Sequence, residues 1–562
     1  MTHLEKFQEL LNDEWESNIR SNPVFATRTG DHRYNDRLGE NDEEFHEKRI
    51  NEFREFEQRL SEINTSDFSE NDKLNFDIFE KQITKASIRL KFRSYRFPLS
   101  KVAGFHTYFP NLHNFVPLNT VKDYNNLIAR LNAFPKFVED NIEIMKAGIK
   151  DGQIPPKVTM DGIVESINKQ ITDSPQESPY FEPFKNISKT LSNTEISKIK
   201  EEGSKAILES INLSLRKLIE FLENEYIPVT RDDIAATNLP NGVAYYQHCI
   251  EYFTSLKLNP QEIHEIGLEE VKRIRSEMEE TIRQAKFEGS IKEFIEFLRN
   301  DSQFYAENPN ILMEKTALVL KKMDGELPTL FKTLPRLPYG IRQIPDFAAP
   351  GNTTAYYQPG SGDGTKSGTY YVNTYDLKSR PLYEVEALSL HEAVPGHHLQ
   401  IALQQEIEMP NFRRFGFFTA FVEGWGLYSE RLGLECGFYQ DPYSNFGRHS
   451  YEMWRACRLV VDTGMHALGW SRQKAIDFMA ENTSLSLLNI TNEIDRYIAW
   501  PGQALAYKLG EIKIRELRAH AEKELQEKFD IREFHDAVLL SGSLPLDVLE
   551  NKINTWIEKL KN

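Results

Sequence analysis

Cysteine is scarce in this chain of 562 residues, and the few cysteines present have no spacing typical of a metal cluster. Cys249, Cys436 and Cys457 are odd in number and far apart, which argues against a disulfide framework. Such thiols are usually reduced and buried. We therefore expect three buried, inert cysteines.

Long apolar runs are also absent. No stretch of about 18 uninterrupted apolar residues occurs, so no membrane span is expected. The first residues lack the apolar core of a signal peptide. Basic residues are outnumbered, with a formal net charge of −17, whereas nucleic-acid binders usually carry a basic face. We expect a cytoplasmic protein with neither nucleic acid nor membrane as a partner; the oligomeric state stays open.

What the sequence does have is helical periodicity along most of its length. Apolar residues recur at three- and four-residue steps, and Asn259-Pro260 is a typical helix start. The sequence predicts helices over residues 2–20, 42–62, 70–95, 121–150, 204–224, 260–286, 291–299, 385–409, 413–434, 446–467, 471–482, 486–498 and 502–528. The fold class is therefore mainly α.

One region interrupts this pattern, between Phe347 and Tyr375. Residues 368–374 have the β-branched and aromatic content of a strand, and residues 355–357 can pair with them across the glycine-rich turn at 359–364. The sequence thus predicts a short β-hairpin. An exposed strand edge can bind an extended peptide through main-chain hydrogen bonds, which makes Tyr371 and Asn373 candidate substrate-binding residues.

Directly after this hairpin the sequence reads His391-Glu392-Ala-Val-Pro395-Gly-His397-His398. Two imidazoles, a carboxylate ligand and an open position are what a zinc peptidase needs, with a further carboxylate as base. The common spacing, His-Glu-x-x-His, places both imidazoles on one helix face. Here the fifth position is Pro395, and the next histidines come later.

A regular helix would not bring these histidines together, because His398 would lie roughly 10 Å along the axis from His391. Pro395 and Gly396, however, both weaken a helix. A wider helical turn that absorbs two residues would move His397 into the place of the fifth-position ligand. His398 remains the alternative metal ligand.

The third ligand is expected on a later helix. Glu423 lies in an otherwise apolar segment, where a carboxylate is costly unless it is paired or bound to metal. A salt bridge from Glu423 to Arg413 or Arg414 is the alternative explanation. Glu430 is the second candidate ligand, although its neighbour Arg431 and its position beyond the apolar segment favour a solvated or a supporting role.

Residues 382–398, 421–430, 496–504 and 507–510, with 26–31 near the start, resemble domain-of-unknown-function family 885. That family is similar to zinc peptidases such as angiotensin-converting enzyme, the thimet oligopeptidases and dipeptidyl peptidase III. Those proteins have His-Glu-x-Gly-His or His-Glu-x-x-Gly-His. The present sequence looks like the next longer form, His-Glu-x-x-x-Gly-His.

The resemblance implies specific roles. His391, His397 and Glu423 would bind one Zn²⁺ ion, and Glu392 would be the general base. Such enzymes also need donors for the developing oxyanion, and Tyr497, Tyr507 and His466 are the candidate catalytic residues. Two further candidates, Arg496 and Lys508, could bind the terminal carboxylate of a peptide; structural ion pairs are the alternative for both.

The resemblance also implies a two-lobed helical metallopeptidase with a central channel, formed by residues 1–562 as one unit, with the catalytic motifs in 345–515. We therefore expect a zinc-dependent peptidase that hydrolyses short peptides, of carboxypeptidase, dipeptidase or oligopeptidase type. Two alternatives stay open. One is a zinc hydrolase of a non-peptide amide or ester, and the other is a catalytically silent peptide-binding protein.

Overall fold

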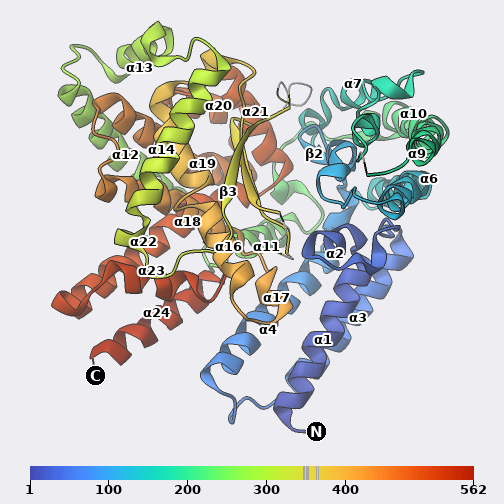
Figure 1. Cartoon of the computed structure of the whole chain (residues 1–562). Coiled ribbons are helices and arrows are strands. Elements are labelled where there is room, and N and C mark those ends of the chain that lie inside the picture. The colour runs from blue at the N-terminus through green and yellow to red at the C-terminus, as the bar shows by residue number, and fades with distance from the viewer. Residues whose placement is uncertain (189, 346–348, 350–352, 363, 365, 562) are drawn as a thin grey trace. The chain divides into compact units, whose positions relative to one another are not determined.

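The computed structural model describes residues 1–562 except 189, 346–348, 350–352, 363, 365 and 562. The chain divides into two compact units, Met1–Gly242 and Val243–Asn562. Helices dominate both units, which confirms the expected mainly α class, and strands are few and short (Figure 1). Among the described residues, no helix is both long and apolar enough to cross a membrane.

The first unit is an assembly of helices around an aromatic core. The helices are α1 (His3–Ser21), α2 (Pro23–Thr29), α3 (Glu43–Ser61), α4 (Glu70–Lys91), α5 (Phe105–Tyr108), α6 (Val121–Lys150), α7 (Ile163–Asn168), α8 (Glu182–Lys185), α9 (Asn193–Ala206) and α10 (Asn212–Phe221), with strands β1 (Leu99–Ser100) and β2 (Ala103–Gly104). Wider turns at Ile207–Ile211 and Leu222–Tyr226 continue the run of α9 and α10. Phe109 and Phe134 stack in the core at 4.5 Å.

The second unit contains all the expected site residues. Its helices are α11 (Gly242–Thr254), α12 (Pro260–Gln284), α13 (Ile291–Asn300), α14 (Pro309–Leu330), α15 (Val385–Glu392), α16 (His397–Glu406), α17 (Asn411–Arg414), α18 (Thr419–Leu432), α19 (Pro442–Ala467), α20 (Arg472–Asn482), α21 (Leu487–Ala499), α22 (Ala506–Leu525), α23 (Ile531–Leu539) and α24 (Leu546–Lys561). As predicted, Asn259 caps α12, and its side chain accepts from the backbone N–H of Glu262.

A three-stranded sheet takes the place of the expected hairpin. The predicted strands form β4 (Ala355–Gln358) and β5 (Gly368–Val372), which pair antiparallel. A third strand, β3 (Tyr339–Gln343), pairs in parallel with the other edge of β5. Since β5 is the central strand, both of its edges are already hydrogen-bonded. Only β3 and β4 offer an outer edge.

Close helix packing fixes the elements that carry the site. On α18, Gly424 faces Gly510 on α22, and a Cβ atom on Gly424 would lie 2.5 Å from the Gly510 backbone. A second glycine, Gly426, faces the ring of His391, where an added Cβ would lie 2.8 Å from the ring atoms. Gly424 therefore lets α18 contact the backbone of α22, and Gly426 leaves room for the His391 ring of α15 against α18.

All three cysteines are free, as expected. Cys249 and Cys457 are buried. The expectation of burial is wrong for Cys436, which is half-exposed because it ends the short helical turn after α18.

Candidate metal centre

The break between α15 and α16 differs from the wider helical turn expected from the sequence. Helix α15 ends at Glu392, residues 393–396 form a turn, and α16 begins at His397. The turn folds back on the helix end, since a Cβ atom at Gly396 would lie 1.9 Å from the carbonyl oxygen of His391. The indole N–H of Trp425 on α18 donates to the carbonyl of Pro395 at 2.9 Å. A sharp break, rather than a bulge, therefore returns His397 toward His391.

Three candidate ligands converge at this break. The Nε2 atoms of His391 and His397 lie 3.7 Å and 3.5 Å from Oε2 of Glu423, and one ligand atom from each residue lies within 4.8 Å of the others. Ligand atoms held by a tetrahedral zinc ion at about 2.0–2.2 Å lie roughly 3.4 Å apart. The donor set, two imidazoles and one carboxylate, and its spacing fit a zinc ion.

The alternative explanation for Glu423 does not fit the structure. Arg413 donates to the carbonyl of Ser541, and Arg414 donates to the carbonyls of Gln405 and Gly362. In the described part of the chain, the ion-pair partners of Glu423 are instead His391 and His397. The side chains of Glu423 and His397 keep 16% and 12% of their surface exposed, while His391 is buried. One side of the group is thus open, as a catalytic rather than a structural zinc site requires.

Charge complementarity holds the group together. Burial alone would lower the pKa of His391, but the carboxylates of Glu423 and Glu430 raise the pKa to about 9. For Glu423, burial opposes ionisation, but the imidazoles of His391 and His397 beside it hold the pKa of the carboxyl well below its usual range. The carboxylate of Glu423 is thus held in its charged form between two imidazoles, a donor set that a metal cation can bind.

Sequence comparison then places the chain in a family. Residues 23–553 match the family described as "Bacterial protein of unknown function (DUF885)". The chain belongs to this family. No curated protein matches the sequence.

Two solved structures resemble this DUF885 member over essentially its whole length. One is described as "the putative lipoprotein from Colwellia psychrerythraea"; it has 28% sequence identity and a TM-score of 0.94, and the match covers 100% of both chains. The other is described as "a putative lipoprotein of unknown function from Shewanella oneidensis". This structure has 18% sequence identity and a TM-score of 0.69, and the match covers 97% of this chain and 99% of that chain. At this identity the likeness supports the fold alone.

The first of these descriptions corrects the expected location. The sequence predicts a cytoplasmic protein, but the solved relative with 28% identity is described as a putative lipoprotein, and lipoproteins are attached to a membrane by a lipid. The cytoplasmic prediction is therefore wrong.

Glu430, the alternative ligand, lies behind His391 rather than beside the other donors. Its Oε1 atom is 2.7 Å from Nδ1 of His391 and 3.3 Å from the guanidinium of Arg455. Glu430 is only 1% exposed. A carboxylate on the far nitrogen fixes the ring orientation and tautomer of a metal-binding histidine. In this DUF885 protein, Glu430 therefore positions His391.

Removing the charge of Glu430 should weaken metal binding without abolishing it. We expect Glu430→Gln to lower zinc affinity by about 10- to 100-fold, the usual effect of losing such a supporting partner. Affinity is measured by competition with a chelator. Glu435→Gln, which changes a carboxylate paired with Arg518 in the next turn, is the matched control and should bind zinc as the unmodified protein does. Equal affinities for both variants would refute the role of Glu430.

His398, the alternative second histidine, points away from the group. Its Nδ1 atom lies 2.9 Å from the hydroxyl of Tyr357 on β4, and its ring packs against Tyr339 on β3. Burial lowers the pKa of His398 to about 4. His398 follows His397 on α16, but its ring faces the sheet. This geometry excludes His398 from the candidate ligand set.

Of the three predicted oxyanion donors, the structure leaves only Tyr507 near the group. Burial, and after it the nearby carboxylate of Glu423, raises the pKa of Tyr507, whose side chain is partly exposed. Tyr497 is buried, and its hydroxyl is engaged by Trp454, Arg458 and Glu493. His466 is buried at the end of α19, with Nε2 3.0 Å from the Tyr497 carbonyl. Neither Tyr497 nor His466 is free to meet substrate.

The two predicted carboxylate-binding cations differ in the structure. Lys508 is fully buried, and its ammonium contacts Glu270, Glu452 and Glu511 at 2.8–2.9 Å. The prediction that Lys508 binds substrate is therefore wrong, because three buried carboxylates surround it. Arg496 stays partly exposed and pairs with Glu493.

The predicted peptide-binding strand residues are also engaged within the protein. The Asn373 side chain is buried and donates to the carbonyls of Ala349 and Thr353. Tyr371 stacks on Tyr356 at 4.9 Å, and its backbone lies on the central strand β5. This geometry gives Asn373 a structural role and removes the main-chain edge of Tyr371 from peptide binding.

Two other groups of acidic and histidine side chains have metal-like spacing, but cations already occupy them. One comprises Glu270, Glu452 and Glu511, which surround the Lys508 ammonium. The other comprises Glu277, His449 and Glu452, and there Arg273 pairs with both glutamates. Among the described residues, only the group at the helix break holds metal-type ligands without a basic side chain between them.

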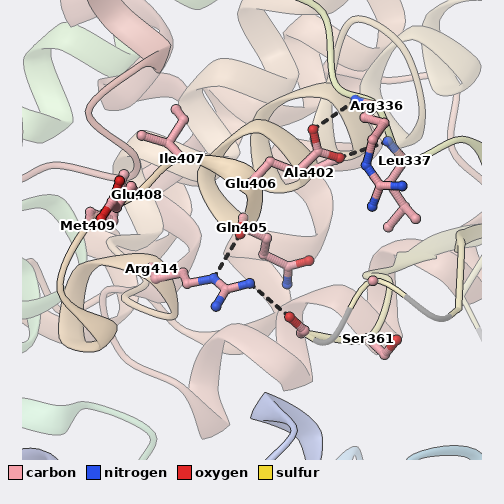
Figure 2. A pocket seen from close by; sticks show the side chains of 12 residues that line it. Arg336, Leu337, Ser361, Ala402, Gln405, Glu406, Ile407, Glu408, Met409 and Arg414 are labelled. Carbon is pink, nitrogen blue, oxygen red and sulfur yellow. Dashed lines mark hydrogen bonds between the residues drawn. The ribbon is translucent and has the colours of Figure 1, made fainter.

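A cavity of about 580 Å³ lies at the opposite end of α16 from His397. Arg414 lies between the carbonyls of Gln405 and Gly362 along one side of it, and Glu406 accepts from the backbone N–H groups of Arg336 and Leu337 (Figure 2). The described lining residues include none of the candidate ligands. The cavity is therefore separate from the metal group.

Proposed function

We propose that this chain is a zinc-dependent peptidase that hydrolyses short peptides. The observation that carries the proposal is the convergence of His391, His397 and Glu423 directly beside Glu392, with one side of the group open to solvent. A free carboxylate next to an open site with two imidazoles and a carboxylate is the arrangement that metal-assisted hydrolysis needs.

When bound, zinc would supply a Lewis acid that polarises the scissile carbonyl and lowers the pKa of a water molecule. Glu392, half-exposed at the end of α15, accepts a proton from the attacking water and delivers it to the leaving amine. The water oxygen forms the new bond to the carbonyl carbon, and the C–N bond breaks. Tyr507 supplies a hydroxyl donor to the carbonyl oxygen as negative charge develops on it.

The test combines metal analysis of the purified protein with incubation against a mixed peptide library and mass spectrometry of the products. We expect about one zinc per chain and cleavage of short peptides, because the resemblance to channel-containing peptidases implies an enclosed site. A large unfolded protein serves as the size control and should not be cut at interior positions. Stoichiometric zinc with no product from any peptide would contradict the proposal.

A further inference from the structure

Two arginines share a single carboxylate next to the proposed active site. Arg458 on α19 lies 3.2 Å from Oε2 of Glu493, and Arg496 on α21 lies 2.8 Å from the same oxygen. Among the described ion pairs, Glu493 is the only acidic partner of Arg458 and of Arg496. The cluster of Arg458, Arg496 and Glu493 therefore carries one positive charge in excess. A buried charge of this kind is costly unless an anion completes it.

The arginines also have unused donors. The Nη1 group of Arg458 is buried and has no hydrogen-bond partner among the described residues. Arg496 uses Nε and Nη2 on Glu493 and one Nη1 contact on Gln503. A guanidinium has more N–H groups than these three contacts use, and its planar fork matches a carboxylate. Arg496 can thus donate to one more anionic group, while the buried guanidinium of Arg458 adds positive charge behind it.

The rings around Arg458 connect this cluster with the metal group. Its guanidinium lies between Trp454 and Tyr507, 4.4 Å from each ring centroid. Tyr507 precedes Gly510 by one helical turn, and Gly510 contacts Gly424, the neighbour of Glu423. On the other side, Arg455, one turn before Arg458 on α19, contacts Glu430. Helices α19 and α22 therefore hold the arginine cluster beside the proposed zinc ligands.

The cluster is accessible from outside the core. The side chains of Arg496 and Glu493 are 17% and 13% exposed, and Tyr507, Gln503 and Trp454 are half-buried. The innermost member, Arg458, is 4% exposed. An anion can therefore contact Arg496 first, with Arg458 behind it as a fixed positive charge.

Resting on the proposed peptidase function, we propose that Arg496, supported by Arg458, binds the terminal carboxylate of the peptide substrate. The chain would then act at the C-terminal end of short peptides, and a peptide without a free carboxylate would be a poor substrate. Lys508, the other basic residue of this sequence region, cannot do this because its ammonium is enclosed by three glutamates.

The experiment uses one short peptide in two forms, with a C-terminal carboxylate and with a C-terminal amide, and the full-length zinc-loaded protein. We expect kcat/KM to be about 10- to 100-fold higher for the carboxylate form, the range that a charge-assisted hydrogen bond supplies. In Arg496→Gln the ratio should fall toward one, and in Arg496→Lys it should be intermediate, because the charge remains but the fork is lost. The same pair is titrated into Glu392→Gln protein to measure binding separately from cleavage.

The control is Arg283→Gln, which breaks an exposed Glu–Arg pair with the same three-residue spacing and should keep the ratio unchanged. Melting temperature and zinc content establish that each variant is folded. Equal cleavage of both forms would overturn carboxylate recognition and leave the peptidase proposal standing. Preferential binding of the carboxylate form without cleavage would support recognition and refute the peptidase proposal. If neither form of the peptide binds, the inference is overturned. If an Arg496 variant fails to fold, the comparison of the two peptide forms on the unmodified protein still tests the inference.

Discussion

His397→Ala is expected to lose most of the bound zinc, whereas His398→Ala keeps it. The helix break returns Nε2 of His397 to within 3.5 Å of Glu423, while the His398 ring faces Tyr357 and the sheet. Removing one of three ligands eliminates a third of the protein donors, but removing His398 leaves all three in place. The measurement is zinc content per chain after dialysis.

Glu423→Ala is the positive control for this comparison and should also empty the site. His398→Ala loses a ring contact and a hydrogen bond to Tyr357, so its melting temperature must be measured beside its zinc content. If His398→Ala empties the site while folded, our account of the break is wrong. If His391→Ala alone loses zinc, other ligands hold the ion.

Glu392→Gln should retain zinc and lower turnover by a factor of at least about 100, the lower range for loss of general acid–base catalysis. Glutamine keeps the shape of the side chain but cannot accept a proton from water. Because Glu392 is not among the converging ligands, metal content should not change. Steady-state turnover of a cleaved peptide and zinc analysis on the same sample give both quantities.

Glu386→Gln is the matched control, because Glu386 is another half-exposed glutamate on α15 and its carboxylate accepts from the backbone N–H of Tyr439. Its turnover should stay within a few-fold of the unmodified protein. Activity of Glu392→Gln at that same level would remove Glu392 from the proposed mechanism.

Helical periodicity predicted most of the helices because their apolar stripes are clear and their ends carry capping residues, as at Asn259. The helix α14 (Pro309–Leu330) was missed, although Asn308 caps it and Pro309 begins it. Strand β3 was missed because its residues are partly or fully exposed and follow no alternation, and its pairing with β5 is a long-range contact.

At the candidate metal centre, the sequence indicated the metal ligands but not the residues that support them. Two imidazoles near a proline and a glycine, with a lone glutamate in an apolar segment, indicated a metal site. The residues alone left His398 and Glu430 as alternative ligands, and the family resemblance favoured His391, His397 and Glu423. The support of His391 by Glu430 depends on how α18 packs against α15, which no local pattern records. Likewise, Lys508 and Arg496 look alike in sequence, but only the fold encloses Lys508 among carboxylates.

The most direct test of the central claim is a crystal structure of the zinc-loaded protein, with anomalous scattering recorded at the zinc absorption edge. Our account predicts one strong peak about 2.0–2.2 Å from Nε2 of His391, Nε2 of His397 and a carboxylate oxygen of Glu423. A fully loaded crystal with no peak there, or with its peak at the group of Glu277, His449 and Glu452, would contradict it.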